Sequence, residues 1–205
     1  MKRRALLLSP LAALAVHRAG AAQPLVPTPA DMEGPYYPPT RPAGEVTDLT
    51  RVPGVRGTAE GERLDLSGTV VGTDGAPIAG AIVEIWQADA RRSYIHPSGA
   101  SGAGRDPAFA GYGRVRTGTD GAYRFTTVRP PAYAVRPPHV HFRVSAPGRP
   151  PLVTQLYFDG QNQEQGWAAP FGRSRADARA LQTVLLERAA DGGWTARFRI
   201  VLADA

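Results

Sequence analysis

Short runs of alternating apolar and polar residues dominate the chain after its first third. A period of two is typical of β-strands that bury one face, and Asp-Gly pairs between such runs indicate turns. The pair Asp120-Gly121 divides one of the runs into two strands around a turn. The runs that predict strands cover residues 64–73, 78–88, 111–128, 139–146, 152–158 and 195–202.

One segment has a helical period instead. Residues 174–190 place Ala178, Leu181, Leu185 and Ala189 on one face, and an Asp-Gly-Gly sequence follows. We therefore predict a helix over 174–190. Six or more short strands with spaced turns favour an all-β fold, a β-sandwich of mostly antiparallel strands with long loops and this one C-terminal helix.

The first residues have the anatomy of a signal peptide. Basic residues precede an apolar stretch from Ala5 to Val16, and small residues follow it. The stretch is too short to span a bilayer. The Arg3-Arg4 pair resembles a twin-arginine signal, although Lys2 stands where Ser or Thr is usual, and a general secretory signal is the alternative. We expect export to the periplasm or the extracellular space, with no membrane association after removal of the signal.

Three segments follow from this organisation. Residues 1–21 are the expected signal peptide, and residues 22–62 form an extended arm rich in Pro, Gly and Thr. Residues 63–205 hold the strands and form the expected β-sandwich domain. The chain has 23 glycines, 20 prolines and no cysteine, so disulfides, Cys-ligated zinc and iron–sulfur clusters are excluded.

The net charge of +6 first suggests nucleic-acid binding. Four of the 24 basic residues lie in the expected signal peptide, and without them 20 arginines face 18 acidic residues. The remaining arginines are scattered along the chain and form no basic run. We therefore expect no nucleic-acid partner.

Half of the four histidines lie one residue apart, in the sequence RPPHVHF. On a strand, residues i and i+2 point to one face, so His139 and His141 project together while Val140 and Phe142 face the core. Two imidazoles on one face are half of a metal site, or equally two polar side chains on a solvated face. The pair alone does not decide between these interpretations.

Tyrosines near the pair extend the pattern. Tyr133 lies six residues before His139 in a proline-rich segment that cannot be a regular central strand, and Tyr94 follows the strand of Trp86. We expect Trp86 to be a core residue. No carboxylate lies near the histidines in the sequence, so a site of two histidines and one carboxylate finds no local support.

The ordered set of motifs resembles the intradiol ring-cleavage dioxygenases. The matching pieces are TPADMEGPYYP, GTVVGTDGAPIAGAIVEIWQAD, the tyrosine at position 94, DPAFAGYGRVRTGTDGAYRFTTV, AYAVRPPHVHF and TQLYF. The likeness runs from about residue 28 to residue 158. It implies a mononuclear ferric ion, Fe(III) or Fe(3+), held by two tyrosines and two histidines, which fall on Tyr94, Tyr133, His139 and His141.

The same resemblance implies an activity. The family cleaves a catechol-type diphenol with O2 between its two hydroxyl-bearing carbons, giving a cis,cis-muconate-type diacid. Its catalytic residues fall on Arg136, on Gln155 and on Tyr133, the metal ligand that the substrate displaces. A phenolate suits a hard ion such as Fe(III), and an arginine can stabilise negative charge on the substrate.

Departures from the family leave the substrate and the assembly open. Only the extended arm precedes the domain, where catechol-type members carry a helical dimerisation segment. The ring substituent, a homo- or hetero-oligomeric state and a partner subunit are therefore not predicted.

Three other readings compete with the enzyme. A secreted β-sandwich binding module would have similar strands but no need for this order of tyrosines and histidines. A noncatalytic subunit of a dioxygenase assembly would not need all four candidate ligands. A zinc or copper protein built on the two histidines would leave the tyrosines incidental, and metal identity separates it from the ferric site.

Overall fold

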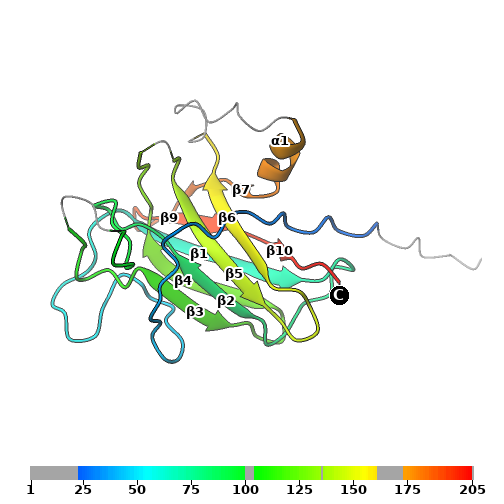
Figure 1. Cartoon of the computed structure of the whole chain (residues 1–205), viewed down its shortest axis with the longest axis horizontal. Helices are drawn as coiled ribbons and strands as arrows, with labels where there is room; N and C mark the ends of the chain where they lie inside the picture. The colour runs from blue at the N-terminus through cyan, green and yellow to red at the C-terminus, as the bar shows by residue number, and fades with distance from the viewer. Residues whose placement is uncertain (1–22, 100–103, 135, 161–172, 205) are drawn as a thin grey trace, which may run out of the picture.

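The computed structural model describes residues 23–99, 104–134, 136–160 and 173–204, so the predicted signal peptide lies outside the described residues. Ten strands and one helix form in this part of the chain (Figure 1). They are β1 (Arg63–Val71), β2 (Ile82–Trp86), β3 (Tyr112–Arg116), β4 (Ala122–Val128), β5 (His139–Ser145), β6 (Leu152–Phe158), α1 (Arg173–Ala180), β7 (Thr183–Val184), β8 (Glu187–Arg188), β9 (Trp194–Arg197) and β10 (Ile200–Val201).

The strands form two mixed sheets, which confirms the predicted all-β sandwich. In one sheet β1 pairs with β4 in antiparallel fashion and with β9 and β10 in parallel, and β8 extends β9. In the other sheet the order is β3-β2-β5-β6-β7, antiparallel except for the last pair. The two sheets lie as layers one behind the other in Figure 1.

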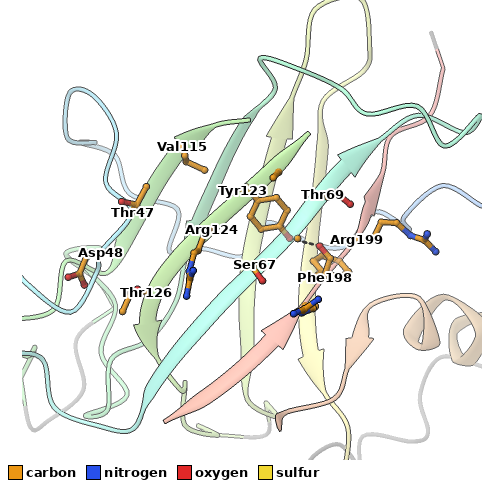
Figure 2. Close-up of a pocket in the computed structure, with 13 residues that line it drawn as sticks. Thr47, Asp48, Ser67, Thr69, Val115, Tyr123, Arg124, Thr126, Phe198 and Arg199 are labelled. Atoms are coloured by element: carbon orange, nitrogen blue, oxygen red, sulfur yellow. Dashed lines mark hydrogen bonds between the residues drawn. The ribbon is translucent and has the colours of Figure 1, made fainter. Parts of the chain in front are cut away.

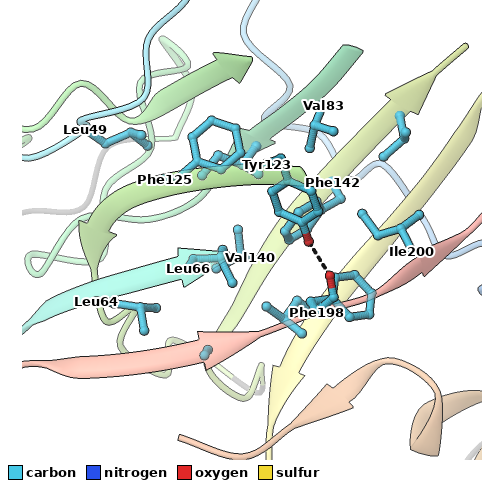
Figure 3. Close-up of a cluster of buried hydrophobic side chains, with 14 of the residues drawn as sticks. Leu49, Leu64, Leu66, Val83, Tyr123, Phe125, Val140, Phe142, Phe198 and Ile200 are labelled. Atoms are coloured by element: carbon cyan, nitrogen blue, oxygen red, sulfur yellow. Dashed lines mark hydrogen bonds between the residues drawn. The ribbon is translucent and has the colours of Figure 1, made fainter. Parts of the chain in front are cut away.

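The core lies between the layers and follows the alternation of the strands. Leu64 and Leu66 of β1 face Val140 and Phe142 of β5, and all four side chains are fully buried (Figure 3). Polar residues between them, such as Asp65, point outward. The inward positions therefore build the hydrophobic core, and the outward positions of β5 are left for the histidines.

The two strands around Asp120-Gly121 form as predicted but do not pair with each other. β3 pairs with β2 and β4 pairs with β1, so the turn carries the chain from one sheet to the other. Gly121 has a φ of +71°, and a Cβ there would lie 2.5 Å from the carbonyl oxygen of Val70. The backbone of β1 therefore requires glycine at this corner.

The predicted helix over 174–190 is wrong in its second half. Helix α1 ends at Ala180, and the chain turns into β7, which pairs in parallel with the edge of β6. The β-branched residues Thr183 and Val184 favour the strand, and the backbone N–H of Tyr157 donates to the carbonyl of Gln182 at 2.8 Å. Leu181 and Leu185, expected on the buried face of the helix, are 44% and 64% exposed.

The N-terminal arm lies against both sheets (blue in Figure 1). Its backbone hydrogen-bonds to Val201 through Thr28 and to Val153 through Asp31. Further along, Leu49 is buried in the core. The boundary predicted between arm and domain at residue 62 stays a prediction, but the arm contributes Leu49 to the core.

Candidate metal centre

His139 and His141 lie on the outer face of β5 and are nevertheless almost fully buried. Their neighbours Val140 and Phe142 point into the core, as the alternation predicted. The indole of Trp86, on the adjacent strand β2, stacks on the ring of His141 with the centroids 4.9 Å apart. Trp86 is fully buried, which confirms its predicted place in the packed interior.

Tyr94 is held by a tight loop after β2. The buried carboxylate of Asp89 accepts hydrogen bonds from the backbone N–H groups of Arg91 and Ser93, each at 2.9 Å, and of Asp106 at 2.7 Å. The backbone N–H of Tyr94 donates to the carbonyl of Gly99. Asp89 is not among the predicted site residues, although a carboxylate in a loop between two site elements was the available signal.

Tyr133 is presented by a short turn of the proline-rich segment. Its backbone N–H donates to the carbonyl of Arg136 and its carbonyl accepts from the N–H of Arg136, at 3.2 and 2.8 Å. The turn folds the chain back, so that the phenol points towards β5. Tyr133 is partly exposed, whereas Tyr94 is buried.

The four predicted ligand atoms converge. The hydroxyl oxygen of Tyr94 lies 2.9 Å from that of Tyr133 and 3.3 Å from Nε2 of both His139 and His141. The Tyr133 oxygen also lies 3.3 Å from Nε2 of His139. Donors about 2.1 Å from a common ion at right angles lie about 3 Å apart, so these separations fit one bound ion.

Hydrogen bonding sets the tautomer of His139. Its Nδ1 lies 2.7 Å from the carbonyl oxygen of Pro137, which can only accept, so Nδ1 carries the proton. The lone pair of Nε2 is then directed at the cluster, as metal-binding histidines require. The buried Nδ1 of His141 has no hydrogen-bond partner within the described part of the chain.

The protonation states also fit a ligand set. Burial lowers the pKa of His139 to about 4 and holds the pKa of His141 well below its usual value, so both imidazoles are neutral. Burial raises the pKa of Tyr94 and of Tyr133, so both phenols are protonated until a cation binds. No group of three His, Cys, Asp or Glu side chains suited to a metal occurs in the described ranges, so a site here depends on the tyrosines.

Arg136 and Gln155 lie beside the cluster and contact each other. The guanidinium donates to Oε1 of Gln155, which also accepts from the hydroxyl of Tyr157 at 2.7 Å. Gln155 pairs with His141 across the strands, so its side chain shares the face of the ligands. All six predicted site residues therefore lie together.

The arm forms a wall of the site. This role was not predicted, because the segment has no periodic pattern of apolar residues. Tyr36 packs on Tyr94 with ring centroids 4.8 Å apart, and the carbonyl of Met32 accepts from Gln155 at 2.7 Å. A Cβ on Gly34 would lie 3.3 Å from Cε1 of His141. The GPYY sequence at 34–37 was the available signal, because glycine permits this close approach.

A groove of about 980 Å³ lies elsewhere, on the outer face of the sheet formed by β4, β1 and β9 (Figure 2). Its polar lining includes Ser67, Arg124, Arg197 and Arg199. It contains none of the predicted site residues. No helix among the described residues is long and apolar enough to cross a membrane.

Known proteins match the chain over most of its length. A family model described as Dioxygenase matches residues 32–203. The protocatechuate 3,4-dioxygenase beta chain of Burkholderia cepacia is 36% identical over 154 residues, which are 69% of this chain and 65% of that protein. Catechol 1,2-dioxygenase 2 of Acinetobacter lwoffii is 34% identical over 65% of this chain and 52% of its own length.

Solved structures give the same result. The dioxygenase domain of a dioxygenase–carbohydrate-binding protein fusion from Streptomyces sp. SirexAA-E superposes with a TM-score of 0.67 and 32% identity, over 88% of this chain and all of that one. The chain spans about half to two thirds of the curated relatives named above. With the family model covering most of the sequence, this chain belongs to the intradiol ring-cleavage dioxygenases.

Proposed function

We propose that the protein is a non-haem Fe(III) intradiol dioxygenase that cleaves a catechol-type diphenol with O2 between its hydroxyl-bearing carbons. The observation that carries the proposal is the convergence of two phenol oxygens and two imidazole nitrogens within 3.3 Å of Tyr94 Oη or Tyr133 Oη. Phenolate oxygens favour a hard ion of high charge, and the site offers no thiolate because the chain lacks cysteine. When bound, the iron would supply the activation of the diphenol towards O2.

The residues of the chain have separate roles in this proposal. Tyr94, His139 and His141 are buried and would hold the metal throughout. Tyr133, which is more exposed and lies on a turn, would be the ligand that gives way to the substrate. Its freed phenolate would then accept a proton from a substrate hydroxyl, acting as a general base at Oη.

Arg136 would stabilise negative charge on the bound diphenol and its oxygenated form. Its guanidinium lies beside the cluster, and Coulombic repulsion by it contributes to the low pKa of both histidines. Gln155 would fix the guanidinium plane through the hydrogen bond between them. The walls formed by Trp86 and the arm would limit the access of water to the metal.

Relatives are named for protocatechuate, catechol, chlorocatechol and hydroxyquinol, which all carry two adjacent ring hydroxyls. We further propose that the protein is exported after recognition of residues 1–21, by the twin-arginine or the general secretory route.

Metal binding tests the proposal first. Protein lacking residues 1–21 should be red-brown, contain one iron per chain, and consume O2 with at least one diphenol of a panel of catechol, protocatechuate and hydroxyquinol. His139→Ala and His141→Ala should lose the iron, the colour and O2 uptake, because each removes one of four donors. Tyr133→Phe should keep iron, shift the visible band and slow turnover.

His96→Ala is the matched control. This histidine accepts a hydrogen bond from Ser98 within its own loop and donates no atom to the cluster, so iron and turnover should be retained. Colourless protein after reconstitution with ferric iron would refute the ferric site. It would favour the alternative that the protein is a β-sandwich binding module without catalytic activity. Stoichiometric zinc or copper in place of iron would favour the metalloprotein built on the two histidines alone.

A further inference from the structure

A second polar pocket lies on the same sheet face as the ligand cluster, one step along the strands. Trp86 pairs across the sheet with Tyr112 and His141. Two residues earlier on β2, Glu84 pairs with Arg114 and Arg143. Side chains at i and i+2 share a face and are about 7 Å apart, so the Arg114–Glu84–Arg143 row is the direct neighbour of the metal cluster.

The arm closes this row into a pocket of about 580 Å³. Tyr37 and residues 41–44 of the arm form one side, and β2, β3 and β5 form the other. This volume is in the range of sites that bind small molecules. The lining is mainly charged or hydroxyl-bearing, which excludes a purely apolar ligand.

The single carboxylate of the lining already has its partners. Glu84 is 8% exposed, and its Oε1 accepts hydrogen bonds from the hydroxyls of Tyr112 and Tyr37, the latter at 3.0 Å. Arg143 lies 4.0 Å from the other oxygen of Glu84 and 3.1 Å from Glu33. Glu33 and Glu84 therefore balance the charge of Arg143. The hydrogen bonds from the two tyrosines leave Glu84 little acceptor capacity for another cation.

Two guanidiniums of the lining stay without an acidic partner among the residues that the structure describes. Arg41 contacts the face of the Tyr37 ring, 5.2 Å from its centroid, and Arg114 lies on β3 opposite Glu84. With Arg143, three arginines face the two carboxylates of Glu84 and Glu33 at the pocket, a local charge of +1. A concave surface with this excess attracts and binds anions.

We propose that this pocket binds a small dicarboxylate, with Arg41 and Arg114 each contacting one carboxylate. An arginine fork matches a carboxylate in a bidentate manner, so two forks on separate elements, arm and strand, can each take one carboxylate of the same diacid. The site is a binding site beside the candidate metal centre. Its ligand binding can be tested independently of the oxygenase activity.

Isothermal titration of the metal-free protein with succinate, at low ionic strength, tests the proposal. The expected result is one site per chain, with acetate and the neutral diamide succinamide each binding at least about tenfold more weakly. Arg41→Gln and Arg114→Gln should each weaken succinate binding at least about tenfold, because each removes a charge-assisted contact. These substitutions leave the core and all ligand residues unchanged.

Arg124→Gln is the matched control, since Arg124 is an exposed arginine of the groove on the other sheet. Succinate binding should be unchanged in this variant. Equal weakening in all three variants would show nonspecific screening and overturn the proposal. Binding that is lost only in Arg136→Ala would place the anion at the metal centre and would overturn it as well, as would absence of saturable heat in the unmodified protein.

Discussion

The candidate ligand residues are positioned by their neighbours. The hydrogen bond of His139 to Pro137 fixes which ring nitrogen faces the cluster, and stacking on Trp86 fixes the ring plane of His141. The i, i+2 spacing of the histidines made their common face predictable. That Tyr94, almost forty residues from Tyr133, would lie within 2.9 Å of it followed only from the family resemblance, because spacing does not encode loop paths.

Arg136 offers a test at this scale. Arg136→Ala should retain one iron per chain, because no ligand atom is removed, but kcat/KM should fall about 100-fold or more, as when a preorganised charge is deleted. Iron content by mass spectrometry and O2 uptake by electrode would measure the two effects. Arg124→Ala, on the outer face of the other sheet, should change neither. Loss of iron from Arg136→Ala would contradict a role in charge stabilisation alone.

The strands were easier to predict from the sequence than the loops. The strands were predictable because β1 and β5 alternate, whereas the loop that carries Tyr94 has no period and depends on the buried Asp89. The helix over 174–190 was predicted from apolar spacing, but β7 pairs with the open edge of β6 instead. Tertiary pairing overrides local preference there.

Asp89→Asn tests the loop. One carboxylate oxygen of Asp89 accepts a hydrogen bond from the backbone N–H of Asp106. In Asp89→Asn the side-chain amide group would take the place of this oxygen and point a donor at another donor. We expect the stability to fall by about 1–3 kcal/mol and Tyr94 to lose its fixed position, with partial loss of iron. Thermal unfolding and the visible band would report both. Asp48→Asn, at an exposed aspartate whose carboxylate accepts hydrogen bonds from Thr50, should have little effect on either.

At the scale of the whole molecule, β1 lies in close contact with the C-terminal strands β9 and β10. A Cβ on Gly68 of β1 would lie 1.8 Å from the carbonyl oxygen of Phe198, between β9 and β10. The strands of β1 and of the C-terminal segment could be predicted from the sequence. Their parallel pairing across a glycine could not, because it joins residues 130 positions apart.

Gly68→Ala should therefore destabilise the fold strongly, by about 3 kcal/mol or more, because the obstacle is backbone and cannot rotate away. Urea unfolding followed by circular dichroism would measure the change. Ser67→Ala, at the adjacent outward position, should alter stability by less than about 0.5 kcal/mol. Equal midpoints for the two variants would contradict the close approach of β1 and Phe198.

The pairing of the arm with the last strand has a consequence for the order of assembly. Thr28 and Val201 hydrogen-bond to each other through both backbone and side chain, across 173 positions of sequence. Contacts of such high contact order form late, because the chain must first close a long loop. Because the same arm forms a wall of the candidate metal centre, stable metal capture during refolding should coincide with the slowest kinetic phase.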